Sequence, residues 1–237
     1  CPQESTITRT WTATDESGNA ASCDQIITVV DTTPPVIECP DHLTVECTDD
    51  TTPAATGEAT ATDNCGAVTI SSADIFDPAC GDTGTIVRTW TAKDECGNES
   101  SCVQIITVID TTPPFIACPA DIEVECTDPI DPDATGVAFA ADTCGEVEVW
   151  ASDEVTTPGC GRTETIVRTR TAQDECGNVS TCEQIITVVD TTPPSITCPP
   201  DIQIECYESP SPDNTGFAQA ADTCGKVEVF WIEIEIP

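Results

Sequence analysis

A segment of 30 residues occurs three times in this chain and constrains its fold more than any other feature. The copies are 6–35, 85–114 and 165–194, and the middle one reads TIVRTWTAKDECGNESSCVQIITVIDTTPP. Two stretches rich in Thr, Val and Ile favour β-strands, and the D-E-C-G-N residues between them favour a tight turn. The prolines that follow favour a stiff, extended linker. Each copy therefore predicts a β-hairpin followed by a spacer.

The spacing of the copies predicts the domain organisation. Their equivalent aspartates, Asp31, Asp110 and Asp190, are 79 and 80 residues apart, so we expect an array of modules of that size. The sequence before the first aspartate matches only the back half of a module, and the sequence after the last one matches only the front half. The predicted boundaries are 1–30, 31–110, 111–190 and 191–237.

Two explanations fit the half-modules at the two ends. The chain is a window on a long tandem array, or its halves complete each other between neighbouring subunits. We favour the long array, because a free subunit that carried half a domain would expose unpaired strand edges.

Strand signals predict the fold class. Between Pro35 and Asp110 we expect about seven short strands, one of them a weak segment near Ile75–Phe76. Their spacing is typical of an antiparallel Greek-key sandwich of the immunoglobulin type, and no stretch has helical periodicity. The predicted fold is all-β, with tandem immunoglobulin-like antiparallel β-sandwich modules of about 80 residues, stapled by disulfides and arranged as beads on a string.

Cysteine usage predicts the compartment. Small modules bury little apolar surface, and the 17 cysteines offer the covalent staples that such modules need. Six recur in each complete module, and an even number in a repetitive chain indicates disulfides and an extracellular location, secreted or at the cell surface. Zinc is the alternative, but the chain has no C-x2-C pair, and His42 is its only histidine.

The charge excludes two classes of partner. Forty-three acidic residues against seven basic ones give a formal net charge of −36. Nucleic acids and anionic membranes bind basic surfaces, so neither is expected as a partner. No apolar run approaches the ~20 residues that span a bilayer, so membrane insertion is not expected. The expected partners are copies of the same chain, end to end and laterally.

Four short motifs carry a family resemblance. They are C-P near the start of a module, A-T-D-N-C in its middle, T-A-x-D-x-x-G-N before the last strand, and D-T-T-P-P in the linker. With these motifs the chain resembles the hyalin repeat along nearly its whole length. The resemblance implies an immunoglobulin-like fold and a role in extracellular adhesion or surface matrices. One departure is that GDTGTIV and GRTETIV stand where the family has a longer F-P-x-G-x-T stretch, so a surface built by that stretch is not carried over.

The immunoglobulin-like topology also implies a disulfide pattern. Six cysteines allow 15 connectivities, and this topology places the first and last strands side by side and the turns at two opposite ends. In the split module Ser17 stands where the other copies have a cysteine, so we expect Cys224 to be the unpaired thiol. The expected pairs are Cys39–Cys102, Cys65–Cys96 and Cys47–Cys80, and Cys118–Cys182, Cys144–Cys176 and Cys126–Cys160.

Acidic residues recur in three places that the same topology brings to one end of each module. These places are the linker aspartate, the A-T-D-N loop and the D-E-C-G-N loop. Their oxygen atoms suit Ca²⁺, which accepts six to eight such ligands in flexible geometry. The alternative is that Asp-x-x-Gly-Asn is a turn in which Asp and Asn bond the local backbone, and one loop can serve both purposes. The candidate calcium ligands are Asp31, Asp63, Asp94, Glu95 and Asn98, and Asp110, Asp142, Asp174, Glu175 and Asn178.

Arginine and tryptophan recur at equivalent positions of the hairpins. Arg9, Arg88 and Arg168 are expected to form structural ion pairs or stacked contacts across a sheet. Arg170 stands where the other copies have tryptophan, so this position is expected to face outward, where either side chain can lie flat. A segment near the end of the chain is also more apolar than its counterparts. The candidate interface residues are Trp11, Trp90, Phe230 and Trp231.

Catalysis is not expected. His42 is replaced by other residues in the sister modules, the cysteines are assigned to disulfides, and the carboxylates repeat in turns. Two non-enzymatic functions remain. One is a structural protein that forms an extracellular rod or filament, and the other is a calcium-dependent adhesin stalk whose modules or tip bind a surface ligand. Variation between the modules is scattered rather than gathered in one patch, which favours the structural protein.

Overall fold

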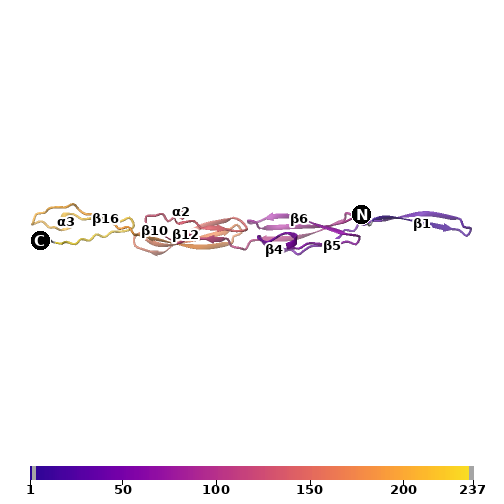
Figure 1. Ribbon diagram of the computed structural model, residues 1–237, viewed down its shortest axis with the longest axis horizontal. Coiled ribbons are helices and arrows are strands. Elements are labelled where there is room, and N and C mark those ends of the chain that lie inside the picture. The colour runs from indigo at the N-terminus through magenta and orange to yellow at the C-terminus, as the bar shows by residue number, and fades with distance from the viewer. Residues whose placement is uncertain (2–3, 235–237) are drawn as a thin grey trace. The chain divides into compact units, whose positions relative to one another are not determined.

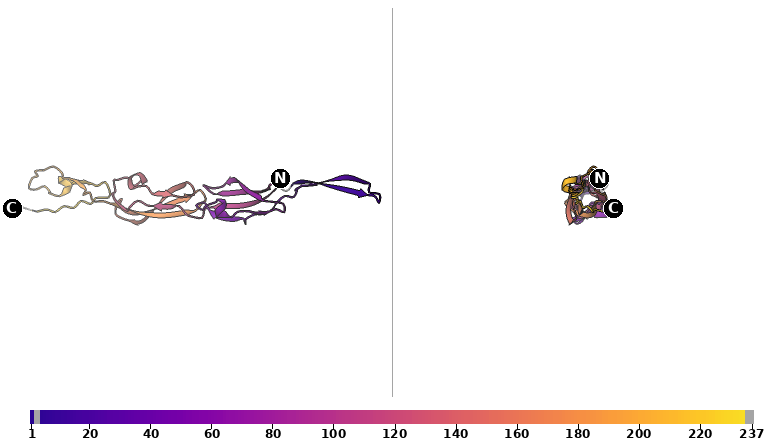
Figure 2. Two further views of the ribbon diagram at one scale, coloured as in Figure 1. Left: turned by 45° about the vertical axis from the view of Figure 1, so that its right-hand side comes forward. Right: turned by 90° about the vertical axis from the view of Figure 1, so that its left-hand side faces the viewer.

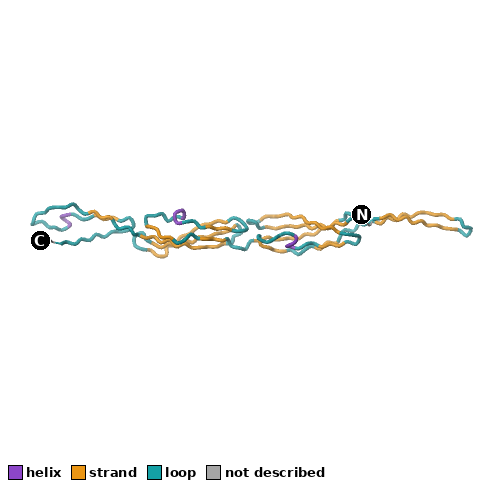
Figure 3. The backbone as a smooth tube through the Cα atoms, viewed as in Figure 1, coloured by secondary structure: helices purple, strands orange, loops and turns teal. Residues whose placement is uncertain are grey.

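The computed structural model describes residue 1 and residues 4–234, and the chain divides into two compact units (Figure 1). Unit 1 comprises Cys1–Thr112 with Thr143–Gly145, and unit 2 comprises Pro113–Asp142 with Glu146–Pro237. Strands make up nearly all the regular structure, and the helices are single turns (Figure 3). The described residues include no helix that is long and apolar enough to cross a membrane. The fold is all-β and consists of tandem immunoglobulin-like sandwich modules.

A β-sandwich with a central hairpin makes up most of unit 1. Its elements are β3 (Val36–Glu38), β4 (Leu43–Glu46), α1 (Pro53–Thr56), β5 (Thr60–Thr62), β6 (Val68–Pro78), β7 (Gly84–Asp94) and β8 (Glu99–Ile109). The larger sheet has the order β4-β8-β7-β6, in which β4 runs parallel to β8 and the other neighbours are antiparallel. The smaller sheet pairs β3 with β5, and β3 contacts the β7–β8 hairpin.

The core of unit 1 lies on one face of the β7–β8 hairpin. Along β7 every second residue is buried, and Ile86 and Ala92 are among them. Ile86 packs with Ile106 and Val108 of β8, and Leu43 of β4 covers this cluster. Because side chains alternate between the two faces of a strand, the β-branched residues that predict the hairpin also supply the core.

Unit 2 repeats this arrangement. Its elements are β9 (Phe115–Ala117), β10 (Ile122–Glu125), α2 (Pro132–Thr135), β11 (Phe139–Ala141), β12 (Val147–Pro158), β13 (Glu164–Asp174) and β14 (Val179–Val189). The larger sheet has the order β10-β14-β13-β12, and β9 pairs with β11. Ile166, Ile186 and Val188 form the core together with Cys126 and Cys224.

Each unit also carries an incomplete set of strands. In unit 1, β1 (Ser5–Thr14) and β2 (Ala20–Val29) pair only with each other, and Figure 2 shows this hairpin, in indigo, without a further strand beside it. In unit 2, β15 (Ser195–Thr197) pairs with β16 (Gln219–Ala221), and α3 (Pro212–Thr215) lies between them in the sequence. The described residues that follow β16 form no strand.

Two details of the predicted strands differ in the structure. The described residues from Pro35 to Asp110 form six strands rather than about seven, because Ile75–Phe76 continues β6. Strand β7 is long enough to pair along all of β6, including Ile75 with Val87, so the ladder does not break. The single-turn helices were not expected. Each begins with a proline, which suits a first helical turn, and each is too short to give a periodic pattern.

The disulfides only partly match the expected pattern. Cys39 is bonded to Cys102 and Cys118 to Cys182, with Cα–Cα distances of 5.9 and 5.7 Å, as predicted. The other four expected pairs, Cys65–Cys96, Cys47–Cys80, Cys144–Cys176 and Cys126–Cys160, are wrong, and Cys224 is not an unpaired thiol. The structure forms Cys1–Cys96, Cys47–Cys144 and Cys126–Cys224 instead, and Cys80 and Cys176 are also disulfide-bonded.

The four wrong pairs share one assumption, that every disulfide closes within one module. The observed turn disulfides join cysteines 95, 97 and 98 residues apart, which is more than one repeat. Cys102 and Cys182 lie within β8 and β14 and bond to a cysteine of their own module. Cys47 and Cys126 lie on turns and bond to a cysteine of the following repeat. The free cysteines among the described residues are Cys23, Cys65, Cys160, Cys198 and Cys206.

Candidate functional site

The three acidic places that the sequence singles out meet in unit 1. Asp31 lies in the linker after β2, Asp63 follows β5, and Asp94 ends β7. One carboxylate oxygen of each residue lies within 4.8 Å of the other two. The fold therefore gathers one predicted ligand from each of the three places into a single cluster, which we call the acidic cluster.

Two oxygens of the acidic cluster are buried without a hydrogen-bond partner. Oδ1 of Asp31 accepts from Thr33 N at 3.1 Å, and Oδ1 of Asp63 accepts from Cys65 N at 2.7 Å. Oδ2 of both aspartates is buried and unpaired, and Asp31 as a whole is 8% exposed. Unpaired buried carboxylate oxygens are costly, and a cation between them would remove that cost. The donor set fits a hard divalent cation such as Ca²⁺.

Asp94 also organises the hairpin turn. Its Oδ1 accepts from Cys96 N and Asn98 N, each at 2.8 Å, and its Oδ2 accepts from Asn98 Nδ2 at 2.8 Å. Burial opposes ionisation, but the hydrogen bonds from Asn98, Cys96 and Gly97 outweigh it and lower the pKa of Asp94. Asn98 Nδ2 also donates to Asp31 O at 3.2 Å. The turn interpretation therefore describes Asp94 and Asn98, and it leaves the two unpaired oxygens of the cluster unexplained.

A free thiol lies beside the acidic cluster. Burial raises the pKa of Cys65, and the charges of Asp31, Asp63 and Asp94 raise it further. The thiol is therefore held protonated, which makes it a weak nucleophile. The same negative potential attracts cations.

The turn at Asp94 recurs in unit 2. Oδ1 of Asp174 accepts from Cys176 N and Asn178 N, each at 2.9 Å, and Oδ2 accepts from Asn178 Nδ2 at 2.9 Å. Asp174 is 6% exposed. Asp174 and Asn178 thus have the turn role that the sequence offered as the alternative to calcium binding.

The remaining candidate ligands occupy linker, loop and surface positions within their own units. Oδ1 of Asp110 accepts from Thr112 N at 3.0 Å, as Asp31 does from Thr33. Glu95 and Glu175 are exposed, and Asp142 is half-buried.

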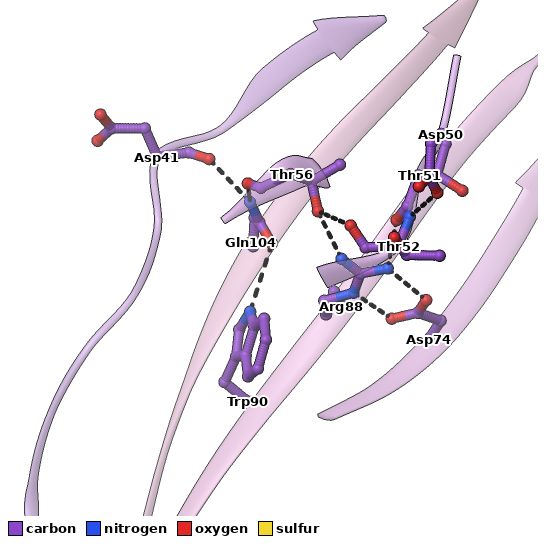
Figure 4. Close-up of polar contacts among 9 residues, drawn as sticks. All are labelled: Asp41, Asp50, Thr51, Thr52, Thr56, Asp74, Arg88, Trp90 and Gln104. Atoms are coloured by element: carbon purple, nitrogen blue, oxygen red, sulfur yellow. Dashed lines mark hydrogen bonds and ion pairs between the residues drawn. The ribbon is translucent and has the colours of Figure 1, made fainter. Parts of the chain in front are cut away.

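Arg88 is the centre of a polar network inside the sandwich of unit 1 (Figure 4). It is 2% exposed and stands opposite Asp74 in the β6–β7 register. Its Nε and Nη2 donate to the two carboxylate oxygens of Asp74, each at 2.8 Å, and this lowers the pKa of Asp74. Nη1 donates to Thr56 Oγ1, and Nη2 donates to Thr51 O, each at 2.7 Å. The expected ion pair across the sheet is confirmed.

Gln104 links this network to Trp90. Nε2 of Gln104 donates to Thr56 O at 2.7 Å and to Asp41 O at 3.1 Å, and its Oε1 accepts from Trp90 Nε1 at 3.3 Å. Trp90 is 4% exposed, so the prediction that it faces outward as an interface residue is wrong. The period of two along β7 carries the missed signal, because Trp90 is four residues from the buried Ile86 and therefore shares its face.

Unit 2 repeats the network with one substitution. Nε and Nη2 of Arg168 donate to Asp153, each at 2.7 Å. Arg170 takes the tryptophan position and is 4% exposed, so it too is buried rather than outward-facing. Its Nη2 donates to Gly136 O, but its Nε and the Oε1 of Gln184 are both buried without a partner. Burial lowers the pKa of Arg170, and the charge of Arg168 adds to this effect.

The other candidate interface residues are exposed. Trp11 is 56% exposed on β1, and Phe230 and Trp231 are 82% and 63% exposed in the segment after β16. Trp11 occupies the position that is buried in the other two hairpins. The exposed candidate interface residues therefore lie on the β1–β2 hairpin and on the segment after β16, the two parts of the chain that have an incomplete set of strands.

Comparison with known proteins relates the chain to a family. The model of the HYR-like domain with 4 cysteines matches residues 35–108. The hyalin of Lytechinus variegatus is 33% identical over 213 residues, which are 81% of this chain and 38% of that protein. The hyalin of Strongylocentrotus purpuratus is 30% identical over 235 residues, which are 93% of this chain and 19% of that protein. The chain thus spans less than half the length of either hyalin.

Several solved structures also resemble the chain. The extracellular cadherin domains 3–6 of Protocadherin Gamma B2 match 80% of this chain and 60% of that one, with 14% identity and a TM-score of 0.33. The EC1–4 region of Drosophila N-cadherin matches 79% of this chain and 58% of that one, with 11% identity and a TM-score of 0.36.

Proposed function

Residues 35–108 of this chain form a hyalin-repeat-like domain, and on that premise we propose that the chain is a structural part of an extracellular rod or filament built from such repeats. Its role is mechanical rather than catalytic. The disulfides support a location outside the cell, secreted or at the cell surface, because such bonds persist in oxidising compartments. The partners of the chain in this role are copies of itself.

The disulfide between consecutive repeats in unit 2 carries this proposal. Cys126, on the turn after β10, is bonded to Cys224, on the loop after β16, with a Cα–Cα distance of 5.8 Å. Arg162 N donates to Cys224 O at 2.8 Å, so a backbone hydrogen bond holds the same loop. Both half-cystines are buried against Ile166 and its neighbours. A covalent bond inside a packed core resists movement of one repeat against the next, which is what a rod requires.

The same connection occurs in unit 1. Cys47 follows β4 and is bonded to Cys144, and Asp82 N donates to Cys144 O at 2.7 Å. A connection that is repeated with the same partners supports a structural joint, because a specific ligand site would be expected once.

The stiffness of the native protein tests this function. We expect electron microscopy of the oxidised protein to show stiff rods, and we expect the persistence length to fall after mild reduction. The double variant Cys126→Ser with Cys224→Ser should reproduce part of that fall, whereas Cys160→Ser, which removes a free thiol, should not. A flexible chain under oxidising conditions would contradict the proposal.

A second function is a calcium-dependent stalk, and the acidic cluster supports it. Asp31 and Asp63 each have a buried, unpaired carboxylate oxygen, and both residues cluster with Asp94 in a chain of net charge −36. Bound Ca²⁺ would neutralise the cluster and fasten the linker that carries Asp31 to the loop that carries Asp63. In this function the modules or a distant tip bind a surface ligand, and Ca²⁺ stiffens the array.

Calcium titration tests the second function. At 100 times its dissociation constant, Ca²⁺ should stabilise unit 1 by about 2.7 kcal/mol against urea, and a chelator should remove this increment and soften the rod without unfolding it. The variant Asp63→Asn should lose the calcium response. Asp77→Asn, which changes an exposed aspartate of β6, should keep it. Equal unfolding midpoints in excess calcium and excess chelator would rule out the stalk's calcium dependence.

A further inference from the structure

We propose that unit 1 binds unit 1 of a second copy of the chain, face to face, through an uncharged apolar patch on the outer face of its larger sheet. The outer face is the one whose side chains point away from the core, and the outer patch comprises Ile75, Val87, Val103 and Ile105. This inference rests on the proposed role in a rod, and it names the surface through which two rods associate side by side. All four residues lie within the complete module of unit 1.

Strand register gathers the outer patch on one face of the sheet. Ile75 of β6 stands opposite Val87 of β7, and Val87 stands opposite Ile105 of β8, so these three form a row across the sheet. Val103 is two residues before Ile105 and therefore shares its face. Nδ1 of His42 accepts from Ile105 N at 2.9 Å, which places His42 beside the row. Four apolar side chains thus adjoin one another on three neighbouring strands.

The outer patch is exposed although its strands belong to the four-stranded sheet of unit 1. Ile75 is 70% exposed, Val103 is 45% exposed and Ile105 is 39% exposed, while Val87 is half-buried. Residues that alternate with them along the strands, such as Ile86, point to the opposite face and form the core. Polar residues usually fill the solvent face of an antiparallel sheet, so a contiguous apolar patch there indicates an interaction site.

The matching face of unit 2 is acidic. Glu154 stands opposite Val167 as Ile75 stands opposite Val87, and Asp121 bonds Ile185 N as His42 bonds Ile105 N. The four carboxylates of unit 2 are all exposed. Differences between the repeats that look scattered along the sequence therefore gather on one face. The pairs of equivalent residues in units 1 and 2 are His42 and Asp121, Thr44 and Glu123, Ile75 and Glu154, and Val103 and Glu183.

Charge explains why the outer face of unit 1 fits a second copy. The net charge of −36 makes two copies repel each other wherever their surfaces are acidic. The charged residues of this outer face lie at its ends, with Asp77 and Glu46 at one end and Lys93 and Glu99 at the other. Two copies can therefore meet at the outer patch without burying carboxylates. The same contact through unit 2 would bury four carboxylates from each copy, which is costly.

The charges at the two ends also set the orientation of the copies. A two-fold axis that runs across the strands places β6 of one copy over β6 of the other, with the strands antiparallel. The end that carries Asp77 then lies over the end that carries Lys93, and this match occurs twice. Lys93 Nζ donates to Glu99 Oε1 at 2.7 Å, and the Lys93 side chain is 53% exposed, so it has donors left for Asp77 of the second copy. A parallel arrangement would place Asp77 over Asp77.

The size of the outer face sets the strength of the association. Four strands about 4.8 Å apart, with about nine residues of about 3.3 Å each, give a face of about 20 by 30 Å. Two copies would bury about 1,200 Å² in all, which is the lower end of the range for specific interfaces. The contact is therefore weak and reversible, and it is strongest at an ionic strength that screens the repulsion between the copies.

The test is sedimentation velocity of the full chain, with its free thiols alkylated, over a concentration series at physiological ionic strength. We expect a reversible dimer with twice the mass of 24.9 kDa. The variant Ile75→Glu with Val103→Glu gives unit 1 the residues that unit 2 carries at these positions, so the fold should survive. This variant should raise the dissociation constant by more than about 100-fold, because the face then brings carboxylates of the two copies together.

Phe115→Glu with Phe139→Glu is the charge-matched control. These phenylalanines are 63% and 65% exposed on the smaller sheet of unit 2, so the control also exchanges two exposed apolar side chains for carboxylates. The dissociation constant should change by less than about threefold, because the added charges act only through screened repulsion. Glu154→Ile with Glu183→Val gives the face of unit 2 the residues of unit 1, and it should produce species larger than a dimer.

A charge swap tests the orientation of the two copies. Asp77→Lys should raise the dissociation constant by about tenfold, because it sets cations against each other at both ends of the interface. Adding Lys93→Asp should restore the dimer. A dimer that Lys93→Asp weakens further would overturn the antiparallel arrangement.

Three results would overturn the inference as a whole. The first is a chain that stays monomeric up to about 1 mM. The second is a dimer that Ile75→Glu with Val103→Glu leaves unchanged. The third is a dimer that Phe115→Glu with Phe139→Glu abolishes, because the contact would then lie on the smaller sheet of unit 2. None of these results concerns the stiffness of a single rod, so failure of this inference is distinguishable from failure of the proposed function.

Discussion

Replacing Arg170 with tryptophan tests whether the buried polar network sets the stability of unit 2. In the native chain the Nε of Arg170 and the Oε1 of Gln184 are both buried without a partner. In unit 1 the same two positions hold Trp90 and Gln104, and the indole Nε1 donates to the amide oxygen at 3.3 Å. Arg170→Trp should create this hydrogen bond in unit 2 and remove both unpaired atoms.

The magnitude follows from three changes. Removing the unpaired Nε of Arg170 and giving the Oε1 of Gln184 a donor are worth about 1–3 kcal/mol each. The variant loses the hydrogen bond from Arg170 to Gly136 O, which lowers the free energy of unfolding by about 1 kcal/mol. It also removes a cation that shares a strand face with Arg168. We expect the free energy of unfolding of unit 2 to rise by about 1–5 kcal/mol, which is roughly a 5- to 4,000-fold change in the opening equilibrium.

Hydrogen–deuterium exchange of the full chain measures this change with an internal control. Amides of β13 and β14 should exchange more slowly in Arg170→Trp, and amides of β7 and β8 should be unchanged, because they belong to the other unit. The reverse variant Trp90→Arg should speed exchange in β7 and β8 and leave β13 and β14 unaffected. Unchanged or faster exchange of β13 and β14 in Arg170→Trp would refute the reasoning.

Two further predictions concern the network of unit 1. The pKa of Asp74 is lowered by its bonds to Arg88, so its contribution is fully present above the unfolded pKa of about 4 and is lost as the pH falls through the lower folded value. Asp74→Asn should therefore lower the urea midpoint of unit 1 at pH 7 by an amount that shrinks as the pH falls through the lowered pKa of Asp74, and a loss that does not change with pH would contradict this cause. Gln104→Leu should cost unit 1 about 2–4 kcal/mol, because the carbonyls of Thr56 and Asp41 lose their donor. Val103→Thr, at a 45% exposed neighbour, is its control and should change stability by less than about 0.5 kcal/mol.

The acidic cluster shows how far the sequence reaches into the site. Its three places were predictable, because turns at one end of a sandwich must lie near one another whatever the detailed geometry. The role of each aspartate within the cluster could not be predicted from the sequence. Asp94 is occupied by its own turn, whereas Asp31 and Asp63 keep an unpaired oxygen each, and only the positions of the surrounding donors decide this difference.

The buried arginine and tryptophan positions show where local reasoning fails. The exchange of Trp90 for Arg170 suggested an exposed site, because isolated arginines are rarely buried. The alternation of buried and exposed residues along the strand instead predicts a buried position, because Trp90 lies on the same face as Ile86. The sequence does not show that the sandwich interior contains hydrogen-bond acceptors for a buried arginine, such as Gly136 O, so it could not decide between these two signals.

The sequence by itself determined the repeat, the all-β modules, the hairpin in each copy and the two disulfides Cys39–Cys102 and Cys118–Cys182. These features depend on side-chain alternation, turn residues and adjacency of strands, which act over short distances along the chain. Tertiary structure decided the turn disulfides and the burial of the arginine network. Each of these depends on which segment lies across a gap from a residue, such as Cys224 beside Cys126, and that proximity is set by packing between repeats.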